Sequence, residues 1–239
     1  ITYQWKPDEG FIDREAIKKA DYIIHLAGAG IADKPWTAQR KKLIRDSRVE
    51  TAKLLAQYIG QDNKQLKAFI SASAIGYYGM DRGQKPLDED SAPGEDFLAQ
   101  VCKEWEAAAQ ETAQHGVPVR LLRVGVVLSG RGGALQQMEQ PVRWMAGAPL
   151  GTGRQYLSWI HIDDLCRAFQ FLLEQPTEKH IFNGTAPHPQ TNRQLTKEIA
   201  RQLGRPLILP KVPAFVLRTM LGRMAEMLLG GTYVQPKAL

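Results

Sequence analysis

An imidazole and two carboxylates stand close together in this sequence and could do acid–base chemistry. His161 precedes Asp163 and Asp164, and a histidine changes its charge near neutral pH. The three residues also stand where a helix is expected to begin, and a histidine that forms a hydrogen bond at a helix start explains the pattern as well. We favour this structural interpretation and keep His161 as a catalytic candidate.

Hydroxyl groups and one thiol are further candidates for chemistry. Ser73 follows an apolar run, and Tyr77 and Tyr78 come shortly after it. The Ser73 hydroxyl could orient a substrate oxygen, although a small polar residue at a strand end also satisfies local backbone groups. Tyrosines in such places more often serve packing. Cys102 falls on the apolar face of a helical segment, where a buried and unreactive cysteine is the favoured interpretation.

Alternating strand and helix patterns must position these residues. The first apolar run ends in the glycine-rich segment 27–30, which is typical of a buried strand entering a loop. The βαβαβ order predicts an α/β protein with a parallel sheet covered by helices on both faces. Strands are expected at 21–26, 68–71 and 119–128, and helices at 37–58 and 97–115.

The second half of the chain is less regular. A capping-box pattern at Thr191 and Gln194 marks the start of one helix, which stops at Gly204. Pro213 is expected to open a last helix that ends near Gly230. Further elements are a helix at 163–174 and a short strand at 181–183. We therefore expect a sheet domain over residues 1–150 and a small, mostly helical substrate lobe over 151–239, with strands that return to the sheet.

The composition is that of an ordinary globular protein, with 239 residues, 44% of them hydrophobic and 23% charged. No apolar run approaches the length of a membrane span. The two cysteines give neither a metal motif nor a disulfide framework, so a reducing, cytoplasmic compartment is the default expectation. The net charge of +6 gathers in residues 201–239. Without a recognised motif, solvated helix faces explain it better than a nucleic-acid surface.

Three segments in order carry a resemblance to a family. They are His25–Gly28, Phe69–Gly79 and Trp159–Leu165, and they resemble the extended short-chain dehydrogenase/reductases, which include sugar-nucleotide epimerases. Four further segments resemble the atypical branch called epimerase family proteins. These are residues 31–36, 132–135, 151–155 and 228–231.

The resemblance implies a Rossmann-type, doubly wound parallel sheet that binds NADP or NAD. The family's glycine-rich phosphate loop lies on its first strand–helix turn, and we find no such turn in this chain. Because the chain also opens on Ile1, we expect that an N-terminal βαβ unit is missing from it. The choice between NADP and NAD stays open.

The resemblance also assigns roles to single positions. Ser73 is placed as the catalytic serine. A substrate, with an anionic group such as a diphosphate, would face Arg154 and Trp159. The cofactor would contact Leu26, Ala27, Gly28, Arg48, Ser71, Arg123 and Val127, of which Ser71 is expected to be buried on its strand.

One family feature is missing. The usual catalytic tyrosine has a lysine four residues later, which lowers the pKa of the phenol. Only Tyr233 and Lys237 show this spacing, and Pro236 between them excludes a helix. Two alignments place the pair at Leu98 and Cys102 or at Ala99 and Lys103, neither of which gives a phenol. Tyr78 and His161 are the substitutes we consider.

Three functions are therefore compared. The first is an NAD(P)-dependent epimerase or reductase that acts on a small polar substrate, such as a nucleotide-linked sugar. The second is a non-catalytic NADP(H)-binding sensor or scaffold. The third and weakest is a nucleic-acid binder. The oligomeric state is open, although long helices that flank such sheets often pair into a homodimer.

Overall fold

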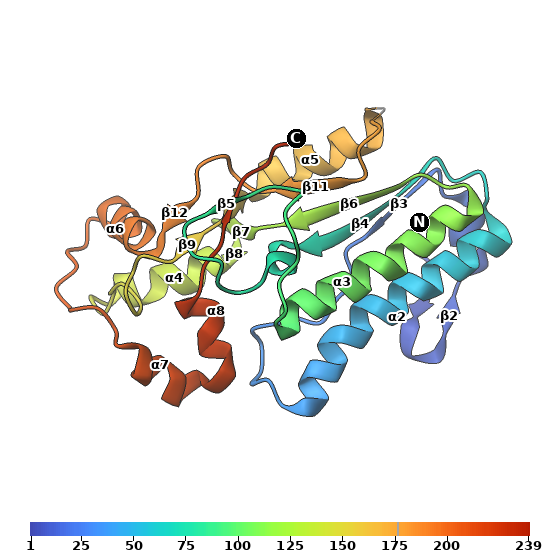
Figure 1. The fold of residues 1–239 in the computed structure, drawn as a ribbon. Coiled ribbons are helices and arrows are strands. Elements are labelled where there is room, and N and C mark those ends of the chain that lie inside the picture. Colours follow the sequence, from blue (N-terminus) through green and yellow to red (C-terminus); the bar gives the residue numbers. More distant parts are fainter. Residues whose placement is uncertain (176) are drawn as a thin grey trace.

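A parallel sheet of four strands forms the centre of the computed structural model, which describes residues 1–175 and 177–239. Helices α2 (Ala38–Asp62) and α3 (Phe97–Gln110) lie side by side on one face, and α5 (Ile162–Glu174) lies on the other (Figure 1). The expected α/β, doubly wound architecture is confirmed. The strand order is β11 (Ile181–Gly184), β6 (Val119–Val124), β4 (Ala68–Ala74) and β3 (Tyr22–His25).

The side chains of β6 alternate between the two helical layers, as in any strand. Arg120 donates to the carbonyl of Leu172 on α5, whereas Arg123 pairs with Glu106 on α3. The apolar strand and helix residues between them form one core cluster. The register then sets Ser73 of β4 beside Arg123, and Arg123 beside Asn183 of β11.

The long helices begin at the residues that the sequence indicates. The Thr37 side chain accepts from the amide of Arg40 and caps α2, which continues to Asp62. Asp96 caps α3 in the same way. The expected helix 97–115 changes after Gln110 into a 3₁₀ turn (Glu111–His115).

The single strand expected over 119–128 is wrong, because the chain breaks at Gly125. There β6 leaves the central sheet and β7 (Val126–Ser129) joins a second sheet with β10 (Trp159–His161) and β8 (Gly132–Gly133). A side chain at Gly125 would place its Cβ 2.6 Å from the carbonyl oxygen of Ser158. Only glycine allows this crossing without movement of the backbone.

The second sheet carries the C-terminal lobe. Helices α4 (Ala134–Arg143) and α6 (Asn192–Gln202) pack around Val142, Ile199 and Ala200. The capping box at Thr191 and Gln194 is confirmed. Two short pairings complete the lobe, β9 (Tyr156–Leu157) with β12 (Gln190–Thr191) and β13 (Tyr233–Val234) with β5 (Pro86–Leu87).

The last helix is interrupted, contrary to expectation. Gly222 adopts a φ of 57°, which favours glycine. The helix is therefore divided into α7 (Ala214–Leu221), a 3₁₀ turn (Gly222–Met224) and α8 (Ala225–Leu229).

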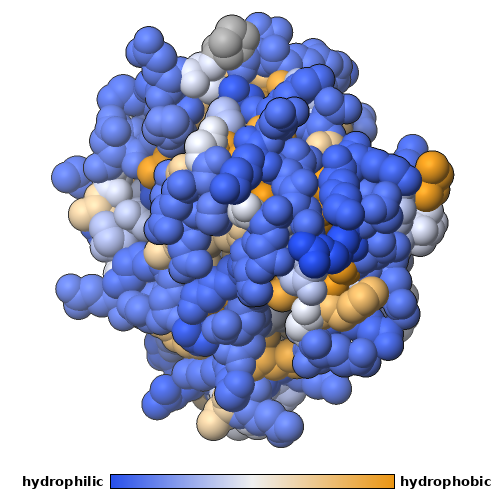
Figure 2. All heavy atoms as spheres, turned by 90° about the vertical axis from the view of Figure 1, so that its right-hand side faces the viewer, coloured by the Kyte–Doolittle hydropathy of each residue, from blue (hydrophilic) through white to orange (hydrophobic). Residues whose placement is uncertain are grey.

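The other end of the molecule holds the N-terminal segment. It forms a hairpin of β1 (Trp5–Lys6) and β2 (Phe11–Ile12), joined by a 3₁₀ turn (Pro7–Glu9), and then α1 (Arg14–Lys19). Figure 2 shows this end, where hydrophilic side chains cover most of the surface and hydrophobic ones are exposed in small groups. Among the described helices none has the length and apolar character needed to cross a bilayer.

Candidate functional site

A cleft of about 470 Å³ opens at the carboxyl ends of β4 and β6, between α3 and the C-terminal lobe. In open α/β sheets ligands bind at this end of the strands. Ser73, Arg48 and Cys102 reach the cleft from the sheet and from α2 and α3, while Tyr156 and Met227 reach it from the lobe. This cleft is the candidate site.

Ser73 lies near the end of β4 and its side chain is held by a carboxylate. The hydroxyl donates a hydrogen bond to Oε1 of Glu106 at 2.6 Å. Leu98 and Cys102, the positions aligned with the usual tyrosine and lysine, line the cleft close by. Burial raises the pKa of the Cys102 thiol to about 12, so this cysteine is an unreactive thiol at neutral pH, as expected.

Glu106 in turn holds Arg123. The guanidinium donates from Nε and Nη2 to the two carboxylate oxygens, at 2.8 and 2.9 Å, and its side chain is 1% exposed. Burial lowers the pKa of Arg123, but the hydrogen bonds and charge of Glu106 outweigh burial and leave that pKa raised. The guanidinium also lies 3.4 Å from the ring centre of Tyr77. Arg123 is therefore a core residue and does not line the cleft.

Tyr78 is fully buried and does not reach the cleft either. Its hydroxyl accepts from Nη1 of Arg123 at 3.0 Å and donates to Oδ1 of Asn183 at 2.8 Å. Burial raises the pKa of this phenol, which moves it away from neutral-pH acid–base chemistry. Both hydrogen-bonding functions of the Tyr78 hydroxyl are used within the core, so the geometry gives no support to the catalytic role predicted for it.

The hydrogen-bond network around Arg123 and Asn183 also holds the C-terminal residues 235–238. Asn183 donates from its side chain to the carbonyl of Gln235. Oε1 of Glu89 accepts from the amides of Asn183, Lys237 and Ala238, at 2.9 to 3.2 Å. The carbonyl of Glu89 itself accepts from Arg123. Hydrogen bonds of Arg123, Glu89 and Asn183 thus join the sheet, the loop after β5 and the C-terminal residues.

Arg48 is the one charged residue among the described residues that line the cleft. It is half-buried, it donates to the carbonyl of Ile44, and it lies 5.3 Å from the ring centre of Trp105. In the described part of the chain no carboxylate pairs with it within 4 Å. Burial lowers its pKa. A Cβ at Gly28 would lie 2.9 Å from Cζ of Arg48, so the two predicted cofactor positions meet.

His161 lies outside the cleft, on the surface. Its Nδ1 accepts from the amide of Asp163 and caps α5. The geometry supports the structural interpretation of this histidine and gives no support to the predicted catalytic one. Ser71 is fully buried, where its hydroxyl donates to the carbonyl of Ala72 and contacts Nδ1 of His25.

The remaining predicted positions are spread over the surface around the cleft. Leu26 is 62% exposed at the end of β3, and Ala27 lines a neighbouring hollow beside α2. Val127 is not among the residues that line the cleft, whereas its neighbour Val126 is. Arg154 is exposed, and Trp159 lines a separate hollow against α6. The structure therefore does not bring Arg154 and Trp159 to the cleft.

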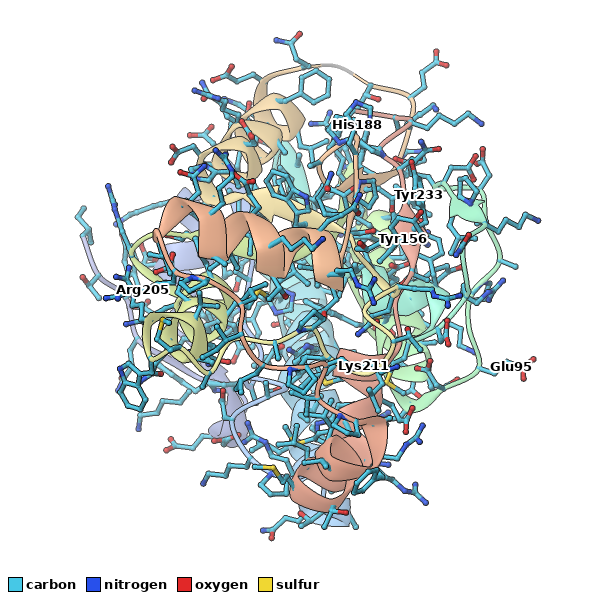
Figure 3. The ribbon with its side chains drawn as sticks, turned by 90° about the vertical axis from the view of Figure 1, so that its left-hand side faces the viewer. Glu95, Tyr156, His188, Arg205, Lys211 and Tyr233 are labelled. Atoms are coloured by element: carbon cyan, nitrogen blue, oxygen red, sulfur yellow. The ribbon has the colours of Figure 1, made fainter. Side chains whose placement is uncertain are left out.

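The Tyr233 and Lys237 pair does not form. Tyr233 packs against Tyr156 with ring centres 4.8 Å apart, and Figure 3 shows the two side chains next to each other. Lys237 instead pairs with Asp88 at 3.2 Å. Their spacing is a coincidence, as expected.

Glu106, which binds both Ser73 and Arg123, is the residue of the site that sequence reasoning missed. It stands four residues after Cys102, on the apolar face of α3 that also carries Val101 and Trp105. A carboxylate on a buried helical face needs a partner, and that position was the available signal. Within the described residues no group of three or more His, Cys, Asp or Glu side chains could hold a metal ion.

The chain is similar to proteins of a known family. Residues 11–183 match the model of the NAD dependent epimerase/dehydratase family, and residues 212–239 match a domain of unknown function, DUF1731. An epimerase family protein of Mycobacterium bovis is 38% identical over 98% of this chain and 77% of its own length. The epimerase family protein YfhF of Bacillus subtilis is 37% identical over 99% and 77%.

Solved structures of similar fold include bound cofactors. The human epimerase family protein SDR39U1, crystallised with NADPH, is 33% identical to this chain, with a TM-score of 0.82. The alignment covers 93% of this chain and 77% of the human chain. A nucleoside-diphosphate sugar epimerase from Corynebacterium glutamicum is 33% identical, with a TM-score of 0.79. The alignment covers 99% of this chain and 45% of that longer protein.

A UDP-glucuronic acid 4-epimerase from Bacillus cereus, solved with its sugar nucleotide and NAD, shares the fold alone, at 16% identity and a TM-score of 0.73. The family match over most of the chain and the relatives above 30% identity together decide the assignment. The chain belongs to the NAD dependent epimerase/dehydratase family, within the atypical short-chain dehydrogenase/reductase branch of the epimerase family proteins.

Proposed function

We propose that this protein binds NADPH at the cleft and reduces or epimerises a small substrate that Ser73 orients. The observation that carries the proposal is the position of Arg48, a half-buried cation at the cleft without a carboxylate partner in the described part of the chain. A buried guanidinium without such a partner is suited to an anionic ligand, because it offers several donors and a fixed charge.

The residues present fit a dinucleotide. Gly28 leaves its backbone bare beside the guanidinium of Arg48, which permits a close approach of a ligand. Leu26 and Ala27 precede it at the carboxyl end of β3 and would contribute backbone groups. The NADPH in the human relative supports NADPH as the first cofactor to test.

A bound nicotinamide dinucleotide supplies or accepts a hydride. The hydrogen of the Ser73 hydroxyl is committed to Glu106, so the lone pairs of its oxygen are free to accept a hydrogen bond from a substrate hydroxyl. As that substrate is oxidised, its proton can pass to Ser73 while Ser73 passes its own to the Glu106 carboxylate. In reduction the protons move in the opposite direction. This relay would replace the missing phenol and lysine.

A second candidate is a sensor or scaffold that binds NADPH without turnover. It is favoured by the absence of any histidine, lysine or carboxylate among the described residues that line the cleft. In this case Ser73 and Glu106 would only hold the core together.

The deciding experiment is a titration of the full-length protein with NADPH and with NADH, followed by nicotinamide fluorescence. We expect saturable binding of NADPH. Ser73→Ala should keep that binding and abolish hydride transfer to any carbonyl compound that the native protein reduces. Saturable binding with no transfer to any compound would favour the sensor. No binding of either nucleotide would refute both candidates.

A further inference from the structure

Two polar side chains on the lobe side of the cleft, Ser158 and Thr232, form hydrogen bonds within the protein. Ser158 donates to the carbonyl of Thr232 at 2.7 Å and accepts from the amide of Val234 at 2.9 Å. The Thr232 hydroxyl donates to the carbonyl of Gly79. The hydrogens of both hydroxyls are therefore committed, so neither group can donate to a sugar oxygen without losing a buried hydrogen bond.

Apolar groups make up most of the remaining wall. Leu98 and Ile75 come from the sheet domain, and Val126, Leu157 and Met227 come from the lobe. The Tyr156 ring packs edge-on against Tyr233. Burying a hydroxyl against such a wall without a partner costs about 2 kcal/mol or more.

The region of unknown function forms one side of this wall. Gly230 and Gly231 follow α8, and a side chain at either position would collide with the backbone of Met80 or Tyr156. The two glycines therefore let the chain pass between these segments and bring Met227 and Thr232 to the cleft.

The charges of the cleft argue in the same direction. A nucleotide-linked sugar carries two phosphates, and anionic groups of this kind are bound in proteins by cationic side chains or several hydrogen-bond donors. Among the described lining residues the one cation is Arg48, which the proposed function assigns to the cofactor. Arg154, the expected diphosphate clamp, is exposed outside the cleft.

From these observations we infer that the substrate is a compact, uncharged and mainly apolar carbonyl compound or the matching alcohol, and not a nucleotide-linked sugar. The inference rests on the proposed function. The cleft of about 470 Å³ must also accept the nicotinamide, which leaves room for a small molecule. In the reductive direction the nicotinamide is oxidised, its hydride forms a C–H bond at the carbonyl carbon, and a proton reaches the oxygen through Ser73 to give the alcohol.

The test measures binding in the absence of turnover. Saturation-transfer difference NMR is recorded on the full-length protein with NADP⁺, using benzaldehyde, cyclohexanone and UDP-glucose as probes. With NADP⁺ the carbonyl probes cannot be reduced, so the signal reports binding alone. We expect transfer to benzaldehyde or cyclohexanone, and no transfer to UDP-glucose at the same concentration.

Two methionine variants test whether the apolar wall binds the probe, one with a charge introduced in the cleft and one with the same charge introduced outside it. Met227→Glu should weaken binding of the carbonyl probe by about tenfold or more, because the carboxylate has no partner in an apolar cleft. Met220→Glu makes the same change on α7, where the side chain is 75% exposed, and should leave binding unchanged. Circular dichroism checks that both variants fold.

Several outcomes would overturn the inference. They are transfer to UDP-glucose that benzaldehyde competes away, absence of transfer to both carbonyl probes, or equal effects of the two methionine variants. If NADP⁺ itself does not bind, the proposed function fails separately. The three probes are then compared on the protein alone, where preference for UDP-glucose still refutes the inference and preference for the carbonyl compounds supports it.

Discussion

Removal of the charge on Glu106 is the most informative perturbation of the polar core. Glu106→Gln keeps the size of the side chain and one carbonyl acceptor, but it removes the negative charge between Ser73 and Arg123. The two oxygens of Glu106 accept three hydrogen bonds of 2.6 to 2.9 Å. An amide cannot accept all of them and also places its NH₂ group against a donor.

The expected loss follows from the burial of the pair. The Glu106 and Arg123 side chains are 9% and 1% exposed, so the variant leaves a buried guanidinium without a counter-charge. Breaking a buried pair by removing one partner costs about 3–5 kcal/mol. For a chain of this length each kcal/mol lowers the melting temperature by about 2–4 °C, so a fall of roughly 6–20 °C is expected.

Thermal and urea unfolding followed by circular dichroism measure this effect. Glu198→Gln serves as the control, because Glu198 pairs with Arg201 on the exposed face of α6 and its loss should not change stability measurably. The double variant Glu106→Gln/Arg123→Met should recover part of the lost stability, since no unpaired charge remains. A Glu106→Gln protein as stable as the native one would refute the reasoning.

Three further perturbations test other parts of the account. Burial lowers the pKa of His25 to about 4 from 6.5. The neutral form therefore contributes about 3 kcal/mol of stability, which is complete above pH 6.5 and lost as the pH falls towards 4. The free energy of unfolding of His25→Gln should fall less over this pH range than that of the native protein, and an equal fall would contradict the assignment. Arg48→Met should weaken NADPH binding by about 10–100-fold in a fluorescence titration. Arg45→Met on the same helix should not, because Arg45 pairs with carboxylates. If Arg48→Met bound NADPH as tightly as the native protein, Arg48 would not belong to the site. Gly125→Ala should lower the free energy of unfolding by about 1–3 kcal/mol, because the added Cβ meets the carbonyl of Ser158. Gly130→Ala should leave it unchanged, because no atom lies within 4 Å of the Cβ added there. Urea unfolding measures both variants.

The central fold was predictable because its signals are local. Apolar runs with helical segments between them predict a parallel sheet, and caps such as Thr37 and the box at Thr191 mark where helices begin. The break at Gly125 was not predictable, because it depends on a contact with a distant segment. The interruption at Gly222 depends on a positive φ that a glycine permits but does not require. At Gly125 the decisive neighbour is the carbonyl of Ser158, which lies between β9 and β10.

The site was predictable only where a strand end decides the position of a residue. Ser73 lies at the end of β4 and Gly28 comes shortly after β3, so their places at the carboxyl edge follow from the topology. Tyr78 and Arg123 are different, because side-chain direction decides their role. The register that sets Arg123 beside Asn183 and turns it towards Glu106 is a tertiary property, and no local pattern in the sequence contains it.

A crystal structure of the full-length protein grown with NADPH tests the central claim most directly. We predict that the dinucleotide lies at the carboxyl ends of β3 and β4, with a phosphate or ribose oxygen on the guanidinium of Arg48 and the nicotinamide facing Ser73. NADPH bound elsewhere on the molecule, or absent from crystals grown at saturating concentration, would contradict the account.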